Sequence, residues 1–443
     1  MIDNIPLDPA ELSDAWDLLS PEERLAGFRM LPPEKAEEFF FDLSADDQAE
    51  LILSLAPGER RIWMRLLEPD DAADVVQAAD EEDRATLLGL LDEATRREVT
   101  ALLAYEEDEA GGLMSSRFAR LRPDITVDEA ISYLRRQALG KIEVETLYYI
   151  YVLDNAQRLL GILSLRELFG APGNRLVRDV MNTDFVAVPE DMDQEAVARL
   201  FAEYDVVALP VINDEGRMVG IVTVDDIVDV VQEETTEDIQ KYGGMEALEE
   251  PYLRIGFIDL MRKRAPWLSI LFIGEMFTTF AMSRFEGKIE EAAFLASFVP
   301  LIISSGGNSG SQASTLVVRA LTLDEIKLRD WWRVVRREFF AGALLGSILG
   351  ALGILRVAVW QLISPIDYNG ALAAGLGTAG MSATVFVSLL GVVMFGTIAG
   401  STLPLLLRKL NFDPASASAP FVATLVDVMG VLIYFAAATA LIL

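Results

Sequence analysis

The chain of 443 residues is 52% hydrophobic, and its mean hydropathy of +0.31 is high for soluble domains of this length, which predicts that part of it lies in lipid. Its formal charge of −32 is concentrated in residues 1–250, which hold 57 of the 69 acidic side chains, and so acidic a surface excludes DNA and RNA as partners. The absence of Cys and His excludes disulfides, zinc fingers and thiolate or imidazole catalysis, and leaves oxygen ligands that suit Mg²⁺ or Ca²⁺.

The amino-terminal part, residues 1–110, carries a leucine repeat of twelve residues. The leucines are followed by phrases that start helices, such as SPEE at Ser20 and EPDD at Glu68. Units this short bury a core only by stacking, so the pattern predicts a compact all-α superstructure, which by itself indicates a protein-interaction domain. The acidic start at Met1 leads us to expect no cleaved signal peptide. The repeated positions are Leu19, Leu31, Leu43, Leu55, Leu67 and Leu91, with Ala79 as the interruption.

Short strands and helices alternate after the acidic phrase YEEDEAGGLM at 105–114, in two copies at 111–175 and 176–242. In each copy a Met precedes a short strand, a Thr or Asp opens a helix, and an apolar strand follows. A polar turn (DNAQ or NDEG), a Gly-led strand and a final helix complete the copy. This order resembles a tandem pair of α/β CBS domains, modules that bind adenosine nucleotides or ions and regulate an attached domain.

The chain turns apolar from residue 267, and each apolar stretch can cross about 30 Å of hydrocarbon. Basic residues cluster before the first stretch and in the second and fourth connections, with six between Arg319 and Arg337. The positive-inside bias therefore predicts a cytoplasmic amino-terminal half and a carboxyl terminus outside the cell membrane. Gly391, Gly396 and Pro404 are expected to mark bends or a tilt in the long fourth stretch. The five predicted spans are 267–283, 292–318, 338–363, 374–407 and 419–443.

Two features of the apolar region differ from lipid-facing helices. The run SSGGNSGSQAST at 304–315 is small and polar, and Asp427 lies in the last span. A carboxylate at that depth costs roughly 3 kcal/mol unless it faces water, a partner or an ion. One interpretation is a pore lined by small groups, with Asp427 at its narrowest part. The other is close helix packing by small residues beside a neutralised Asp427.

Together, phrases along the whole chain resemble the MgtE family of magnesium transporters. They are EEDEAGGLM, TVDD with TEDI, APWL, GGNSGSQASTLVVRAL and FDPASASAPFVATLVDVMG, in this order. The resemblance implies a homodimeric, multi-domain membrane protein with a helical superstructure, paired CBS domains, a connecting helix at 243–266 that plugs the pore, and a five-helix transmembrane domain at 267–443. It implies a Mg²⁺-selective transporter, not an enzyme, that closes when intracellular Mg²⁺ is sufficient.

The resemblance also implies the residues that line the pore. The central cation is expected to keep its water and to be touched by Asp427, because Mg²⁺ loses its hydration shell reluctantly. One carboxylate per subunit with carbonyls around it suits a hydrated ion. The remaining pore positions are Gly307, Asn308, Ser311, Thr315 and the carbonyl of Ala423.

Regulatory Mg²⁺ sites are implied in the acidic half. Residues of the helical repeats are expected to face residues of the second CBS unit, and the run after TVDD is expected to meet the connecting helix and the partner subunit. Tyr149 and Arg166 in the first CBS unit match the positions that hold ATP in relatives. The regulatory positions are Glu38, Asp70, Asp74, Glu195, the carbonyl of Ala202, Asp205, Asp226, Asp229, Glu234, Glu237, Asp238 and Asp413.

Two other classes of protein stay open on the residues alone. A CBS-regulated anion channel is disfavoured by Asp427 and would need basic or helix amino-terminal anion sites. A membrane-anchored Mg²⁺ or nucleotide sensor would explain the acidic half but not the polar run at 304–315. We find no nucleophile–base pair or phosphate loop in the sequence that would indicate an enzyme.

Overall fold

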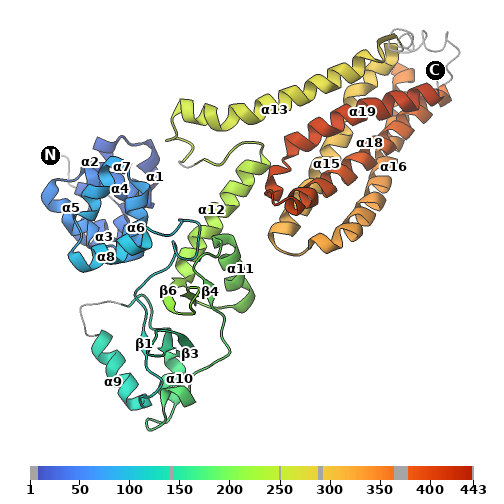
Figure 1. Cartoon of the computed structure of the whole chain (residues 1–443). Helices are drawn as coiled ribbons and strands as arrows, with labels where there is room; N and C mark the ends of the chain where they lie inside the picture. The colour runs from blue at the N-terminus through green and yellow to red at the C-terminus, as the bar shows by residue number, and fades with distance from the viewer. Residues whose placement is uncertain (1–7, 139–143, 249–250, 288–292, 364–377, 442–443) are drawn as a thin grey trace. The chain divides into compact units, whose positions relative to one another are not determined.

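In the computed structural model the chain folds into two compact units (Figure 1). The first unit is Met1–Glu234 and the second is Thr235–Leu443. The boundary falls inside one helix, α12 (Val224–Tyr242). The structure describes residues 8–138, 144–248, 251–287, 293–363 and 378–441.

Short α-helices stack in the amino-terminal part of the first unit, which confirms the predicted superstructure. Ser20 and Ser44 accept hydrogen bonds from the first turns of the helices that follow them, as the phrases predicted. A proline stands in the first turn of the helices that begin at Pro21, Pro33, Pro57 and Pro69. The repeated leucines stand in the links between helices, where Leu31, Leu55 and Leu67 are buried. The helices are α1 (Pro9–Ala15), α2 (Pro21–Met30), α3 (Pro33–Phe41), α4 (Ala45–Ser54), α5 (Pro57–Met64), α6 (Pro69–Ala78), α7 (Glu81–Leu88) and α8 (Glu93–Leu102).

The two α/β copies have the same sheet topology. In each, the first strand pairs parallel to the second, and the second pairs antiparallel to the third. Gln157 (φ 63°) and Gly216 (φ 72°) take the left-handed conformation in the corresponding hairpin turns, so the predicted duplication is confirmed. The elements are β1 (Arg120–Leu121), α9 (Val127–Ala138), β2 (Tyr149–Leu153), β3 (Leu159–Ser164) and α10 (Leu165–Gly170), then β4 (Val188–Pro189), α11 (Gln194–Tyr204), β5 (Ala208–Ile212), β6 (Met218–Thr223) and α12.

The final helices of the two copies differ in length. Helix α10 has 6 residues, whereas α12 has 19. Ile227 and Val230 are buried at the start of α12, while Val231 and Ile239 farther along are exposed. Helix α12 therefore belongs to the second copy at its beginning and extends well beyond it.

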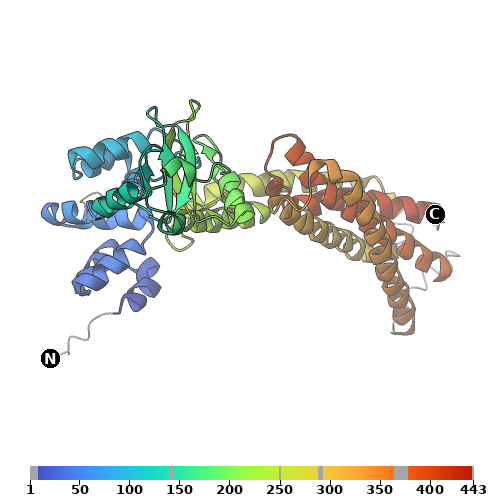
Figure 2. The same cartoon turned by 90° about the horizontal axis from the view of Figure 1, so that it is seen from below.

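Long helices lie side by side in the second unit, as Figures 1 and 2 both show. Four of them have the length and hydropathy to cross a membrane: α13, α16 with its preceding turn, α18 and α19. Helix α15 is long enough at 24 residues, but its run at 304–315 makes it more polar, and it packs on α18 and α19. The bounds are α13 (Phe257–Ser283), α15 (Val299–Thr322), α16 (Trp331–Ile363), α18 (Thr378–Lys409) and α19 (Ala419–Leu441), with short 3₁₀ turns at Ala293–Phe298, Leu328–Asp330 and Pro414–Ser416.

One expectation about a helix boundary needs correction. The connecting helix expected at 243–266 is not a separate element, because the described residues 245–248 and 251–256 are not helical and α13 runs from Phe257 into the first apolar stretch. The fourth stretch is one helix of 32 residues that contains Pro404 and continues through Gly391 and Gly396, so the bends or tilt expected there stay a prediction.

Glycines let the central helices of the second unit approach closely. A Cβ added to Gly396 or Gly400 on α18 would collide with the backbone of Gly306 or Gly310 on α15. These contacts bring one face of the polar run against α18, as small residues do in membrane helix pairs. The core around this crossing contains Val392, Val422, Val426, Tyr434 and Phe435, all fully buried.

Candidate functional site

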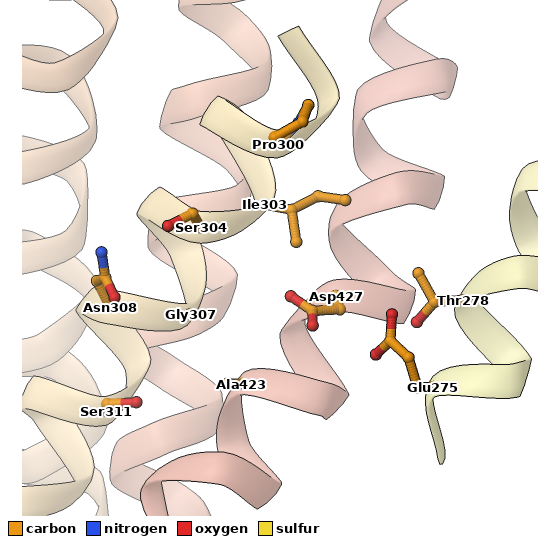
Figure 3. A pocket seen from close by; sticks show the side chains of 10 residues that line it. All are labelled: Glu275, Thr278, Pro300, Ile303, Ser304, Gly307, Asn308, Ser311, Ala423 and Asp427. Atoms are coloured by element: carbon orange, nitrogen blue, oxygen red, sulfur yellow. The ribbon is translucent and has the colours of Figure 1, made fainter. Parts of the chain in front are cut away.

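A hollow of about 380 Å³ lies in the second unit between α13, α15 and α19 (Figure 3). Helix α19 contributes Ala423 and Asp427, one turn apart. A Mg²⁺ ion with six waters occupies roughly 200 Å³, at about 30 Å³ for each water. The hollow is therefore large enough for a hydrated cation. Helix α13 lines it with Glu275 and Thr278, and α15 with Pro300, Ile303, Ser304, Gly307, Asn308 and Ser311.

The structure brings together five of the six residues expected in the pore. Thr315 is the exception, because it lies one turn beyond Ser311 on α15. Its hydroxyl donates a 2.8 Å hydrogen bond to the Ser311 carbonyl and lies 2.6 Å from the hydroxyl of Tyr242. Thr315 thus contacts the end of α12, while the other five surround the hollow.

The residues of the polar run at 304–315 lie on two faces of α15. Gly306 and Gly310 face α18, whereas Gly307 and Ser311, each one position later, line the hollow. Residues four apart share a face of a helix, so the two pairs form separate stripes. One stripe therefore packs against α18, as the packing interpretation expected, whereas the other lines a hollow, and its role in a pore stays a prediction.

The hollow contains a second carboxylate that was not predicted from the sequence. Glu275 of α13 faces Asp427 of α19 across it (Figure 3). The lining residues that the structure describes include no Lys or Arg. A single charged residue in the apolar stretch WLSILFIGEMFTTF was the signal that could have identified Glu275.

A second group of carboxylates lies within the first unit. Burial raises the pKa of Asp70 to about 7, and the charges of Asp71 and Asp226 add to this effect. Burial likewise raises the pKa of Asp74 to about 8 and that of Asp226 to about 6. Three of the expected regulatory positions, Asp70, Asp74 and Asp226, thus lie close enough to affect one another. Because its negative charges repel one another, such a cluster binds either protons or a cation.

Glu68 and Glu145 extend this cluster, and the sequence analysis did not predict them. One carboxylate oxygen from each of Glu68, Asp70 and Glu145 lies within 4.8 Å of the others. Each of the three has a buried oxygen without a hydrogen-bond partner in the described part of the chain. Burial, followed by the contact with Glu68, raises the pKa of Glu145 to about 9. The donor set is all oxygen, which fits a hard divalent cation.

The other expected regulatory residues make contacts of their own. Asp238 accepts a 3.3 Å hydrogen bond from Thr322, and the carboxylates of Glu237 and Asp413 both pair with Lys241. Two of the remaining residues pair with basic residues on their own helices, because Glu38 lies 3.8 Å from Lys35 and Glu195 lies 3.0 Å from Arg199. Glu234 accepts a hydrogen bond from Gln194, and Asp229 is close enough to raise the pKa of Asp71. Ala202 and Asp205 lie at the end of α11.

The expected nucleotide residues lie near one end of strands β2 and β3 in the first sheet. Tyr149 begins β2 and pairs with Ser164 of β3, and Arg166 follows two residues later in α10. Arg166 is exposed. The two side chains are therefore on neighbouring segments, and ATP binding there stays a prediction.

Family models match most of the chain, with residues 234–298 outside the matched ranges. The model described as a divalent cation transporter matches residues 299–437, and the MgtE intracellular N domain matches residues 7–108. The CBS domain model matches twice, at 110–174 and 177–233. These limits agree with the helical superstructure, the two α/β copies and the helices from α15 to α19.

Two similar proteins support the same assignment. The magnesium transporter MgtE of Thermus thermophilus is 43% identical over 442 residues, which cover 98% of this chain and 93% of that protein. MgtE of Enterococcus faecalis is 34% identical over 76% of this chain and 70% of its own length. A crystal structure of the cytosolic domain of the Mg²⁺ channel MgtE in complex with ATP is 46% identical, with a TM-score of 0.47, over 51% of this chain and 92% of that one. The chain belongs to the MgtE family of magnesium transporters.

Proposed function

We propose that this chain conducts Mg²⁺ through the hollow between α13, α15 and α19, with Asp427 as the selectivity carboxylate. The observation that carries the proposal is the convergence of Asp427, Ala423, Gly307, Asn308 and Ser311 on one hollow. These groups offer only oxygen and amide contacts, and they suit a cation that keeps its water. A transporter for a hydrated ion needs this combination of size and weak contacts, because tight binding would prevent release.

The proposed working form is a homodimer in the cell membrane. Glu275, Ser304 and Asn308 line the hollow yet remain exposed in a single chain. Polar side chains at membrane depth avoid lipid, so a second copy related by a twofold axis would close the hollow. In this arrangement the amino-terminal domains are cytoplasmic and the carboxyl terminus is outside.

Intracellular Mg²⁺ is proposed to close the pore by binding the acidic residues before α13. Opposed carboxylates repel by roughly 4 kcal/mol for a pair 4 Å apart at an effective dielectric near 20. A divalent cation between them reverses the sign of the interaction and stabilises the compact state. Because such sites exist only in that state, binding shifts the equilibrium towards it. The first unit's cluster of Glu68, Asp70, Asp74, Glu145 and Asp226 and the acids of α12 are the proposed sensors.

Reconstitution into proteoliposomes tests the transport function. We expect Mg²⁺ influx with this chain alone and loss of selective influx in Asp427→Asn, which keeps the side-chain shape but removes its charge. Asp14→Asn, an exposed Asp on α1, is the matched control and should transport like the parent. Equal Mg²⁺ influx in Asp427→Asn and the parent would show that Asp427 does not select the ion. Anion flux, or Mg²⁺ binding without flux, would favour the channel or sensor alternatives.

A second experiment tests gating. Neutralising Asp226, Glu234, Glu237 and Asp238 together should give a pore that stays open at Mg²⁺ concentrations that close the parent. Closure of this variant at the parent's concentration would show that these acids are not the sensor. Tags at Met1 and Leu443 test the topology, since only the second should be reachable from outside intact cells.

A further inference from the structure

The first apolar helix, α13, carries one carboxylate deep in its sequence. Glu275 stands between Gly274 and Met276 in a stretch that is otherwise apolar or hydroxylated from Trp267 to Ser283. A carboxylate facing lipid at such a position costs roughly 3 kcal/mol or more. Its side chain instead points into the hollow towards Asp427 (Figure 3).

A close helix contact fixes this orientation. A Cβ added to Gly274 would lie 2.7 Å from the Cγ2 methyl of Thr424 on α19, so only glycine permits this approach. Glu275 follows Gly274 directly, and Asp427 lies three residues after Thr424, on the same side of α19. The glycine contact therefore brings the two carboxylates to the same level of the hollow.

Thr278, one turn after Glu275, has an unusual hydroxyl. It is 5% exposed, and it has no hydrogen-bond partner in the part of the chain that the structure describes. Ser269 on the same helix and Thr424 on the facing helix each donate to the carbonyl four residues earlier, at 2.7 and 3.0 Å. Thr278 does not make this hydrogen bond to the carbonyl four residues earlier. It lines the hollow, and its hydroxyl lies on the side of Glu275 (Figure 3). A buried unpaired hydroxyl costs about 1–3 kcal/mol unless something in the cavity binds it.

The charges in the hollow call for a cation. Two carboxylates face each other, and none of the described lining residues is basic. Such a pair either shares a proton or binds a positive ion. In the proposed dimer, two copies of Asp427 already match the charge of one divalent cation, and two copies of Glu275 double the negative charge around it.

We propose that Glu275 and Thr278 belong to the cation site of the pore, with Glu275 as a second selectivity carboxylate opposite Asp427 and Thr278 as a hydroxyl that contacts the ion's hydration water. The inference rests on the proposed transport function and extends it to α13. In this site the ion is held through its water by two carboxylates from each subunit. Oxygen donors and doubled charge favour divalent over monovalent ions.

The test measures Mg²⁺ flux and the ratio of Mg²⁺ to Na⁺ flux for the full-length protein in proteoliposomes. Glu275→Gln should raise the half-saturating Mg²⁺ concentration about 10- to 100-fold, the usual loss when a group that orients a metal's ligands is removed, and should admit Na⁺. Thr278→Val should raise it about 2- to 10-fold, as expected for one hydrogen bond. Glu286→Gln, which removes an exposed carboxylate three residues after the end of α13, is the matched control and should behave like the parent.

The outcomes separate this inference from the transport proposal. If Glu275→Gln matches Glu286→Gln while Asp427→Asn loses Mg²⁺ selectivity, Glu275 is not part of the site and the pore assignment stands. If Asp427→Asn also matches the parent, the ion does not pass this hollow and both proposals fail. Glu275→Asp, which keeps the charge and shortens its reach, decides the question should the Gln variant not fold: a raised half-saturating concentration with Na⁺ still excluded supports the site, and the parent's value overturns it.

Discussion

The phenolic hydroxyl of Tyr242 donates a 2.8 Å hydrogen bond to the carbonyl of Ser311. Tyr242 is the last residue of α12, the helix that begins in the second α/β copy, and Ser311 lines the hollow on α15. The same hydroxyl lies 2.6 Å from that of Thr315. The acidic helix is therefore joined to the pore-lining helix by side-chain contacts in the second unit.

We predict that Tyr242→Phe weakens the response of the pore to intracellular Mg²⁺. The change removes a hydrogen bond worth about 1 kcal/mol and leaves the ring in place, so the half-closing Mg²⁺ concentration should rise roughly fivefold. Flux measured at a series of internal Mg²⁺ concentrations gives this value. Tyr133→Phe, at an exposed position on α9, should leave it unchanged. An unaltered half-closing concentration in Tyr242→Phe would mean that this contact does not couple α12 to the pore.

Lys241 leads to a prediction of the opposite sign. Its ammonium group pairs with Glu237 and lies 2.9 Å from Asp413, two of the proposed regulatory carboxylates. Lysine thus occupies the place that a cation would take between them. Lys241→Met should free both carboxylates for Mg²⁺ and lower the half-closing concentration several-fold, because a competing charge is lost. Lys327→Met, which removes a 3.1 Å pair with Asp324, is the control. A higher half-closing concentration in Lys241→Met would show that the lysine itself stabilises closure.

The pH dependence of the first unit follows from its buried carboxylates. Asp70, Asp74 and Asp226 have pKa values raised to about 7, 8 and 6 by burial, whereas an unfolded Asp titrates near 3.9. The folded state therefore binds more protons than the unfolded state between about pH 4 and 8, and without metal its stability should fall as pH rises through this window.

Mg²⁺ should change that dependence, because it binds the deprotonated carboxylates. Stabilisation of the first unit by Mg²⁺ is expected to be larger at pH 8 than at pH 6. Hydrogen-exchange protection factors of peptides from α6, in the full-length protein with and without Mg²⁺, measure this difference. Equal protection by Mg²⁺ at both pH values would show that the ion does not compete with protons at these residues.

Several features of this fold could be predicted from the sequence because they depend on local pattern. The twelve-residue repeat predicted the stacked helices, because each repeated leucine stands in the link between two short helices. Duplicated strand and turn signals predicted both sheets, and hydropathy predicted the long helices. The two stripes of α15 also follow from helical spacing once the run at 304–315 is known to be a helix.

Other features depend on contacts between distant segments. Asp70 and Asp226 are more than 150 positions apart, and only packing within the first unit brings them together. The first span is apolar on average, so Glu275 did not stand out in its hydropathy. Its likeness to a site residue depends on Asp427, which lies opposite it only in the folded structure. The start of α13 at Phe257 was missed because the apolar pattern begins ten residues later than the helix.

The last prediction concerns Glu68 and Glu145, and its two effects have opposite signs. With no cation present, three carboxylate oxygens within 4.8 Å repel or must bind protons, so Glu68→Gln with Glu145→Gln should increase the metal-free stability of the first unit. The same change removes two ligands, so Mg²⁺ should stabilise the double variant less than the parent. Protection factors of α6 peptides at pH 8, measured with and without Mg²⁺, report both effects. Glu203→Gln, an exposed residue of α11, should alter neither. A structural role for the pair would instead lower stability in both conditions, and an unchanged response to Mg²⁺ would show that the cluster holds protons and not a cation.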